Sequence, residues 1–188
     1  MIWLVRHGET EWSLSGAHTG RTDIPLTANG EKQAAALGRR LDGHSFALVL
    51  TSPMARARET CRLAGFADRA AIDPDLVEWD YGDYEGKSTA DIRRSRPDWS
   101  LFRDGVPNGE SIEQVADRAR RVLARCMQAG GDAALFAHGH ILRILTADWL
   151  ELPPADGSLF ALGTATLSTL GYEHETRVIT SWNLSISE

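Results

Sequence analysis

The amino-acid sequence predicts an α/β fold, a three-layer sandwich in which helices cover both faces of a mixed, mostly parallel sheet. Three short apolar runs, at 2–5, 47–50 and 133–137, show no alternation of polar and apolar residues. Continuous apolar runs of this length are typical of strands that are covered on both faces. A stretch with helical spacing follows each run, and strands that alternate with helices indicate a layered α/β arrangement.

The first two predicted helices have recognisable start signals. Thr27 is the expected N-cap of a helix that places Ala34 and Leu37 on one face. Ser52 is expected to cap the next helix, with Pro53 at its first helical position. Each helix begins shortly after an apolar run or after the loop that follows one.

The clearest helix begins at Ser111, which can form a capping box with Gln114. Its apolar residues recur at helical spacing, and the glycine pair at 130–131 ends it. A further helix is predicted from about residue 141 to residue 150, before two consecutive prolines. These helices supply the outer layers of the sandwich.

The middle and the end of the chain differ from this pattern. Residues 75–108 are rich in Asp, Gly, Pro and Trp, which predicts a loop-rich lid segment with a short helix near 90–94. Two late runs, 165–170 and 177–182, predict strands around a turn near 172–175. The whole chain of 188 residues is therefore expected to form a single domain, residues 1–188, that includes this lid.

Bulk properties exclude several function classes. The formal net charge is −6, which argues against nucleic acid as the main partner because phosphate backbones attract basic faces. No apolar stretch is long enough to span a membrane. Cys61 and Cys126 belong to no ligand-spaced cluster and are expected to be core thiols in a reducing compartment. We therefore expect a soluble, cytoplasmic protein, with a homodimer left open.

Polar groups follow the first three predicted strands directly. Arg6 and His7 come after the first strand, Ser52 and Arg56 after the second, and the segment His138-Gly139-His140 after the third. In open α/β sheets, ligands bind at the carboxyl ends of the strands. The sequence therefore predicts that arginines and histidines gather at one edge of the sheet.

This combination of side chains is suited to phosphoryl transfer. Guanidinium groups such as those of Arg6 and Arg56 match phosphate oxygens, and helix N-termini add N–H donors. His7 could attack phosphorus with one ring nitrogen while the other donates to a backbone carbonyl. His138 could bind an equatorial phosphoryl oxygen. Spreading positive charge over these oxygens accounts for most of phosphoryl-transfer catalysis.

A proton donor for the leaving alkoxide is also needed. Glu78 is the first candidate, because a carboxyl beside a bound phosphate and Trp79 would have a raised pKa. Residue type alone does not separate it from Asp80. Other assignments are equally open: His18 and His140 could line the pocket or lie beside it, and Trp12 and Trp79 could form its walls. Spacing alone does not choose Arg56 over Arg58 and Arg62, two of which should lie on a solvated helix face.

Five segments in order resemble the histidine phosphatase superfamily, the phosphoglycerate mutase-like proteins. They are residues 6–10 (RHGET), 19–27 (TGRTDIPLT), 52–57 (SPMARA), 78–86 (EWDYGDYEG) and 138–140 (HGH). The resemblance covers nearly the whole chain and implies the same mixed α/β sandwich. It implies His7 as nucleophile, Arg6, Arg56 and His138 as phosphate pocket and Glu78 as proton donor, with no metal or cofactor. It also implies that Ser13, Thr19 and Gly20 line the pocket.

The superfamily contains hydrolases and mutases, and the chain has features of the hydrolases. It is compact, and Glu78 is followed by Trp79 and Asp80 rather than by the basic residues that a second phosphate needs. Segments 78–86 and 136–140 also resemble phosphatases of the acid phosphatase and sedoheptulose-1,7-bisphosphatase types. That resemblance implies a sugar phosphate substrate, which Tyr81, His140 and Arg143 would help to bind.

The sequence analysis thus predicts a phosphomonoesterase that acts on a small phosphorylated metabolite through a phosphohistidine. A 2,3-bisphosphoglycerate-dependent phosphoglycerate mutase is the first alternative, and a non-enzymatic phosphate-binding module is the second. A metallohydrolase is a third class, but only His138 and His140 have a spacing that fits metal ligands. Neither nucleic acid nor a membrane is an expected partner.

Overall fold

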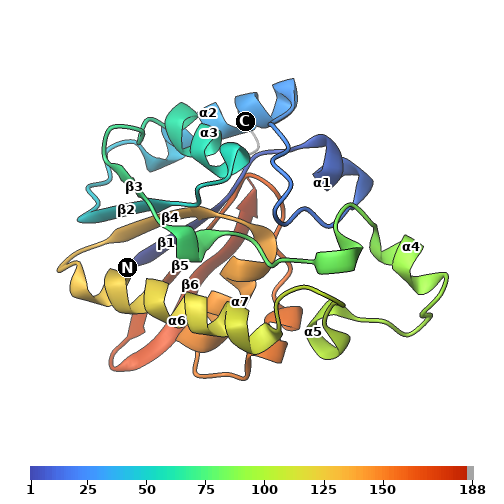
Figure 1. Cartoon of the computed structure of the whole chain (residues 1–188). Helices are drawn as coiled ribbons and strands as arrows, with labels where there is room; N and C mark the ends of the chain where they lie inside the picture. The colour runs from blue at the N-terminus through green and yellow to red at the C-terminus, as the bar shows by residue number, and fades with distance from the viewer. Residues whose placement is uncertain (186–188) are drawn as a thin grey trace.

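A six-stranded mixed sheet lies at the centre of the computed structural model, which describes residues 1–185 (Figure 1). The strand order is β3-β2-β4-β1-β5-β6, in which β1 to β4 run parallel and β5 and β6 run antiparallel to their neighbours. The strands are β1 (Ile2–Arg6), β2 (Leu48–Thr51), β3 (Ala70–Ile72), β4 (Ala133–Ala137), β5 (Thr166–Glu173) and β6 (Thr176–Ser185). The predicted mostly parallel sheet is confirmed.

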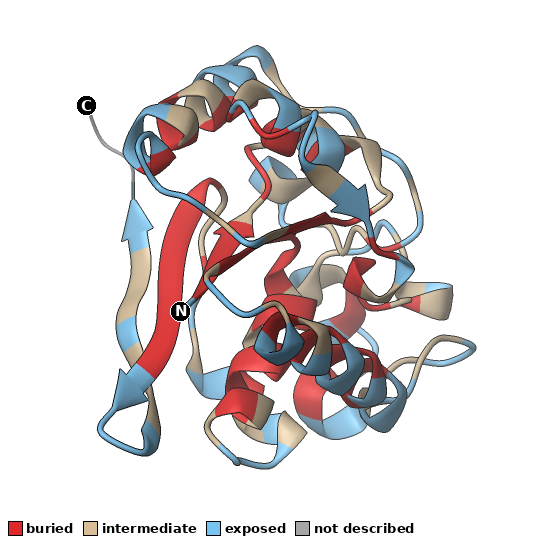
Figure 2. Ribbon diagram, turned by 90° about the vertical axis from the view of Figure 1, so that its left-hand side faces the viewer, coloured by how far each residue is buried: buried red, intermediate tan, exposed pale blue. Residues whose placement is uncertain are grey.

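Helices cover both faces of this sheet. Helices α2 (Ala28–Leu41) and α3 (Ala55–Leu63) lie on one side, and α6 (Ile112–Gln128) and α7 (Gly139–Trp149) lie on the other (Figure 2). Alternate residues of β1 point to the two layers: Ile2 and Leu4 pack in the cluster under α6 and α7, whereas Trp3 and Val5 pack in the cluster under α2 and α3. This division confirms the three-layer sandwich, because a strand with both faces buried needs apolar residues at every position.

Two of the predicted helix starts are confirmed, and that of the helix after β2 is wrong. Thr27 accepts a hydrogen bond from Gly30 N, and Ser111 forms the expected capping box with Gln114. Ser52 does not cap α3, which begins three residues later at Ala55. The reason is that Asp23, from a distant loop, accepts from the backbone N–H of Ala55 at 2.8 Å, while Ser52 contacts His138 at 2.7 Å between Oγ and Nε2.

Short elements account for the segments that sequence periodicity did not reveal. The helix expected near 90–94 is α4, which begins one residue earlier. The turn between β5 and β6 is tighter than expected, because Glu173 already pairs with Thr176. Elements of three to six residues are too short to show a period. They are α1 (Glu11–Ser15), η1 (Pro74–Leu76), η2 (Gly82–Tyr84), α4 (Thr89–Arg93), α5 (Leu101–Asp104) and η3 (Pro154–Leu159).

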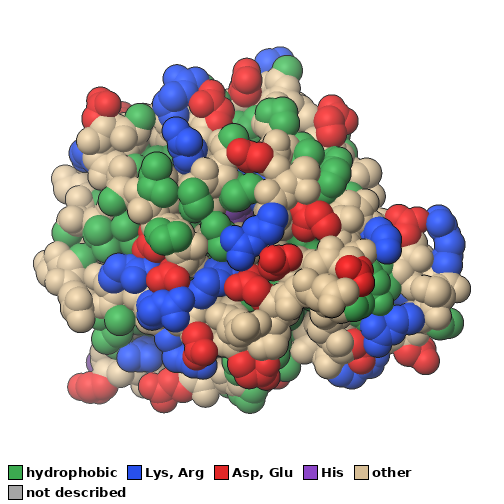
Figure 3. Space-filling model, in the orientation of Figure 1, with side chains coloured by type: hydrophobic (Ala, Val, Ile, Leu, Met, Phe, Trp, Pro, Cys, Tyr) green, Lys and Arg blue, Asp and Glu red, His purple; other side chains and the backbone are tan. Residues whose placement is uncertain are grey.

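The face that α6 presents to solvent carries basic and acidic side chains in close alternation (Figure 3). Arg121 and Arg125 of α6 pair with Asp75 at 2.6 and 2.7 Å, and Arg125 also pairs with Asp73 at 2.8 Å.

Both cysteines are buried, as predicted for core thiols. Within residues 1–185, no helix is both long and apolar enough to cross a membrane.

Candidate active site

Three parallel strands deliver their terminal residues to one edge of the sheet. Strand β4 lies between β1 and β2, and Arg6 pairs with Ala137 while Thr51 pairs with Phe136. The residues that follow each strand therefore lie side by side, as the sequence predicted. At this edge is a cavity of about 230 Å³. The predicted site residues that line it are Arg6, His7, Ser13, Thr19, Glu78, Tyr81, His140 and Arg143.

His7 is held rigidly at the end of β1. Its backbone N–H donates to Ala137 O at 3.0 Å, and its carbonyl accepts from Ala165 N at 2.9 Å. In the side chain, Nδ1 lies 2.8 Å from Gly8 O. A carbonyl oxygen only accepts, so Nδ1 carries the proton and Nε2 keeps a free electron pair. Burial, and then the charges of Arg6 and Arg56, lower the pKa of His7 to about 3, which keeps the imidazole neutral.

Gly8 is required by a close approach of two backbone segments. A Cβ atom built on Gly8 would lie 2.5 Å from the carbonyl oxygen of Gly30 in α2. The backbone N–H of Gly8 donates to Thr60 Oγ1 at 3.0 Å, and Thr60 in turn donates to Arg56 O. The glycine of the 6–8 segment therefore brings α2 and α3 against the residue that carries the imidazole.

Arg6 supplies an unused hydrogen-bond donor beside His7. Its Nη1 donates to the carbonyl of Leu162, but its buried Nε has no hydrogen-bond partner within residues 1–185. A buried N–H without a partner costs free energy. The guanidinium lines the cavity, so an anion bound there could satisfy this donor and the positive charge together.

Arg56 and His138 lie next to His7 but are not among the residues that line the cavity. Arg56 is fully buried, and its Nε donates to His138 Nδ1 at 3.2 Å. Its two Nη atoms donate to the carbonyls of Thr19, Gly20 and Thr22, each at 3.0 Å. Four of the five N–H donors of the guanidinium are thus used. Arg58 and Arg62 are exposed, so the residue chosen by the resemblance is the buried one.

His138 is neutral and has a partner on each ring nitrogen. Arg56 can only donate, so Nδ1 accepts and Nε2 carries the proton toward Ser52 Oγ at 2.7 Å. Burial and the charge of Arg56 hold the pKa of His138 well below its usual range. The rings of His138 and His7 are 5.2 Å apart between centroids. His138 therefore packs against the predicted nucleophile with its Nε2 proton shared with Ser52.

Glu78 lies in the cavity, where the protein groups around it lower its pKa. Its carboxylate accepts from the backbone N–H groups of His140 and Ile141, each at 2.9 Å, and so caps the N-terminus of α7. Burial alone would raise the pKa of Glu78. The backbone N–H donors at the N-terminus of α7 outweigh burial and hold the pKa well below its usual range. These donors also start α7 at residue 139, two residues earlier than predicted.

Tyr81 and His140 form a pair on the wall beside Glu78. The hydroxyl of Tyr81 lies 2.6 Å from His140 Nδ1. Burial and the charge of Glu78 hold the pKa of Tyr81 well above its usual value, so the phenol keeps its proton and donates it to Nδ1. His140 is then neutral with its proton on Nε2, in line with the lowering of its pKa by burial.

Of the other residues that the sequence offered for the site, Trp12, Asp80, Trp79 and Gly20 do not line the cavity either. Asp80 accepts from Gly82 N at 3.0 Å and faces Arg21. Trp79 is fully buried in the core and donates to the carbonyl of Glu110 at 2.9 Å, so it does not wall the pocket. Gly20 uses its carbonyl for Arg56. Between the two candidate proton donors, only Glu78 reaches the cavity.

The outer wall of the cavity combines predicted and unforeseen residues. Ser13 and Thr19 bond to nearby carbonyls, and Arg143 donates to Gly157 O at 3.0 Å and to Ser158 O at 3.1 Å. His18, which the sequence left open, is on the wall, and burial lowers its pKa to about 4. Gly139, from the predicted segment 138–140, also lines the wall, and the residues without a sequence signal of their own are Gly16, Ala17, Thr89 and Leu162.

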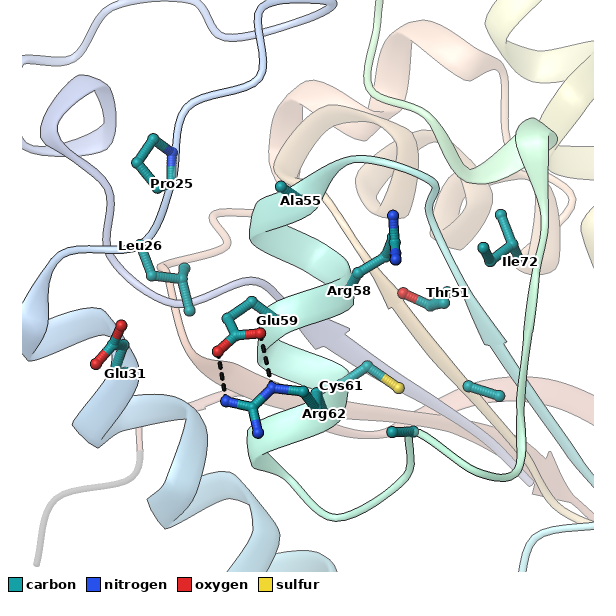
Figure 4. Close-up of a pocket in the computed structure, with 12 residues that line it drawn as sticks. Pro25, Leu26, Glu31, Thr51, Ala55, Arg58, Glu59, Cys61, Arg62 and Ile72 are labelled. Carbon is teal, nitrogen blue, oxygen red and sulfur yellow. Dashed lines mark hydrogen bonds and ion pairs between the residues drawn. The ribbon is translucent and has the colours of Figure 1, made fainter.

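A second, larger cavity of about 580 Å³ lies over α3 and contains none of the predicted site residues (Figure 4). Arg62 and Glu59, which line it, form a two-bond pair with N–O distances of 2.6 and 2.8 Å. Among residues 1–185, no group of three or more His, Cys, Asp or Glu side chains is placed to hold a metal ion. His138 and His140 in particular face different partners, Arg56 and Tyr81.

The chain belongs to the histidine phosphatase superfamily, branch 1, whose family model matches residues 2–185. It is 41% identical over 180 residues to an acid phosphatase of Mycobacterium tuberculosis, with coverage of 94% of this chain and 88% of the relative. It is 40% identical over 181 residues to a sedoheptulose 1,7-bisphosphatase of Saccharomyces cerevisiae, with coverage of 79% and 67%. A solved structure of an M. tuberculosis protein superposes with a TM-score of 0.94 at 39% identity, covering 99% of this chain and 98% of that one. The protein is an enzyme of the phosphatase class, as the resemblance implied.

The buried neutral histidines predict a loss of stability in mild acid. Folding lowers the pKa of His7 to about 3 and that of His18 to about 4, so below the ordinary pKa of about 6.5 the unfolded chain binds more protons than the folded one. Stability then falls as pH falls. At pH 5 each of the two histidines should cost about 2 kcal/mol. Denaturant unfolding at pH 7 and pH 5 measures this loss. His18→Gln should reduce it, and an unchanged free energy of unfolding would contradict the neutral assignment.

Proposed function

We propose that this phosphatase hydrolyses sugar phosphates through a phosphohistidine formed on His7, without a metal or cofactor. The observation that carries the proposal is the pairing of a neutral His7 with an unpartnered, buried Arg6 Nε in one cavity. A neutral imidazole is a competent nucleophile, and the arginine donor matches a phosphoryl oxygen. Two of the relatives that resemble the chain are phosphatases by name, one of them for a sugar bisphosphate.

The first step transfers the phosphoryl group to the enzyme. The electron pair on Nε2 of His7 forms the N–P bond while the P–O ester bond breaks and its electrons go to the alkoxide oxygen. That oxygen takes a proton from the carboxyl of Glu78. A bound phosphate dianion beside Glu78 opposes its negative charge and raises its pKa above that of the free enzyme. The proton is therefore available when substrate occupies the cavity.

The second step regenerates the enzyme. The carboxylate of Glu78 takes a proton from water, and the water oxygen attacks phosphorus as the N–P bond breaks and its electrons return to Nε2. Arg6 holds the phosphoryl oxygens throughout. Arg56 contributes its charge and its one unused donor, and His138 could turn its Nε2 proton from Ser52 to an oxygen of the transition state.

Hydrolysis is favoured over the mutase reaction by the charges on the cavity wall. Within residues 1–185, Arg143 is the only arginine besides Arg6 that lines the cavity, and two of its nitrogens are bound to carbonyls. A bound bisphosphate would need more cationic donors for its second phosphate. We assign Arg143, Tyr81, His140, Ser13 and Thr19 to the alcohol part of the substrate.

The rest of the proposal is a cytoplasmic enzyme that acts on small metabolites, with neither nucleic acid nor a membrane as partner, as a monomer or homodimer.

A substrate screen tests this proposal. Phosphate release from sugar phosphates and aryl phosphates should persist in EDTA and should exceed isomerisation of phosphoglycerate in the presence of 2,3-bisphosphoglycerate. Isomerase turnover far above hydrolysis would identify a mutase. Loss of activity in EDTA, restored by a divalent cation, would identify a metallohydrolase, and phosphate binding without turnover would identify a binding module.

A further inference from the structure

The segment that carries Glu78 is held by a buried ion pair outside the cavity. Arg118 of α6 is only 8% exposed, and its Nε and Nη2 donate to the two carboxylate oxygens of Glu110, each at 2.9 Å. This is the two-bond geometry that fixes a guanidinium against a carboxylate. Neither residue lines the cavity. The pair instead contacts residues on both sides of Glu78, which does line the cavity.

The Arg118–Glu110 pair forms hydrogen bonds to the backbone on both sides of Glu78. Before Glu78, Nη1 of Arg118 donates to the carbonyls of Asp75 at 2.7 Å and Val77 at 2.9 Å. After Glu78, the carboxylate of Glu110 accepts from the backbone N–H of Asp80 at 2.9 Å.

The backbone of Glu110 adds two more bonds on the same side. Its N–H donates to Asp80 O at 3.0 Å, and its carbonyl accepts from the indole of Trp79 at 2.9 Å. Every residue next to Glu78 is thus bound to the pair or to its backbone.

A buried ion pair of this kind is weak support for stability, because apolar residues of similar volume stabilise a core equally well or better. The guanidinium of Arg118 nevertheless fixes the position of the segment around Glu78 closely. It donates to four acceptor atoms, which are the two carboxylate oxygens of Glu110 and the carbonyls of Asp75 and Val77. A general acid must be held close to its productive geometry, since a displacement of about 1 Å can cost about 10²-fold in rate. We propose that Arg118 and Glu110 are positioning residues that hold the Glu78 carboxyl at the leaving-group oxygen. This inference rests on the proposed role of Glu78.

Substrates with different leaving groups distinguish a positioning role of Arg118 and Glu110 from a general effect on the stability of the fold. An alkoxide needs the proton of Glu78, whereas p-nitrophenolate leaves without one. The measured quantity is the ratio of kcat/KM for glycerol 1-phosphate to kcat/KM for p-nitrophenyl phosphate, which does not depend on the folded fraction of a preparation. Arg118→Lys keeps the charge but cannot make the four bonds. We expect this ratio to fall about 10- to 100-fold.

Arg121→Lys is the matched control. Arg121 lies on the same helix and forms a two-bond pair with Asp75, but it is exposed and makes no bond to residues 77–80. Its ratio should stay within about 2-fold of the parent enzyme. Glu110→Gln, which weakens the same pair from the other side, should lower the ratio as Arg118→Lys does. An equal loss on both substrates in Arg118→Lys, or an unchanged ratio, would overturn the inference.

Glu78→Gln distinguishes failure of this inference from failure of the proposed function. If Glu78→Gln lowers the ratio and Arg118→Lys does not, Arg118 is structural and Glu78 remains the donor. If Glu78→Gln leaves the ratio unchanged, the donor assignment itself is wrong, and the inference falls with it. If both variants lower the ratio, the positioning role stands.

Discussion

Replacement of His7 by asparagine is expected to lower phosphate release by about 10⁴-fold or more on every substrate. The amide cannot act as a nucleophile toward phosphorus, so direct attack by water would be the only path left. The cavity would otherwise persist, because the backbone bonds of residue 7 to Ala137 and Ala165 do not involve the side chain. Steady-state release of p-nitrophenol measures the loss.

A matched histidine outside the cavity provides the control for this variant. His174 is exposed in the β5–β6 turn and has a φ of +54°, a conformation that asparagine tolerates well. His174→Asn should keep full activity. A His7→Asn enzyme that retains activity within about tenfold of the parent would show that another group attacks phosphorus.

Replacement of Glu78 by glutamine is expected to have the second-largest effect, and a selective one. General acid catalysis contributes about 10²- to 10⁴-fold, so kcat/KM for a sugar phosphate should fall by that factor. For p-nitrophenyl phosphate the loss in kcat/KM should be small, because its leaving group needs no proton. The same steady-state assay with the two substrates measures the difference.

Asp80→Asn is the control for this variant, because Asp80 is the other carboxylate that the sequence allows as donor. Its side chain bonds to Gly82 N and lies away from the cavity. The selectivity between the two substrates should be unchanged in Asp80→Asn. A collapse of sugar phosphate turnover in this variant, with Glu78→Gln unaffected, would reverse the assignment.

The layered fold and the edge that carries the site could be predicted because each buried strand is a continuous apolar run. His7 and His138 follow such runs directly, so their place at a strand end was readable from the sequence alone. The order of the strands in the sheet could not be predicted from the sequence. The closeness of His7 to His138 depends on β4 lying beside β1, and no local pattern records which strands pair.

The contacts of Arg56 and the ionisation of Glu78 could not be predicted, for a physical reason. Arg56 binds backbone carbonyls of residues 19–22, and every residue type presents the same carbonyl. Glu78 caps α7, a helix whose N-cap, His138, makes no side-chain cap bond. A helix that starts without a capping side chain needs an acceptor from elsewhere, but the sequence does not show which carboxylate supplies it.

Identification of the phosphorylated residue tests the role of His7 most directly. The Glu78→Gln variant lacks the base that activates water, so the intermediate should accumulate during a reaction with ³²P-labelled aryl phosphate that is quenched in alkali. A P–N bond survives alkali and breaks in acid. We predict an alkali-stable, acid-labile label on the peptide that contains His7. Label on a peptide that contains His18, His138 or His140, or turnover with no label on any histidine, would contradict His7 as the nucleophile.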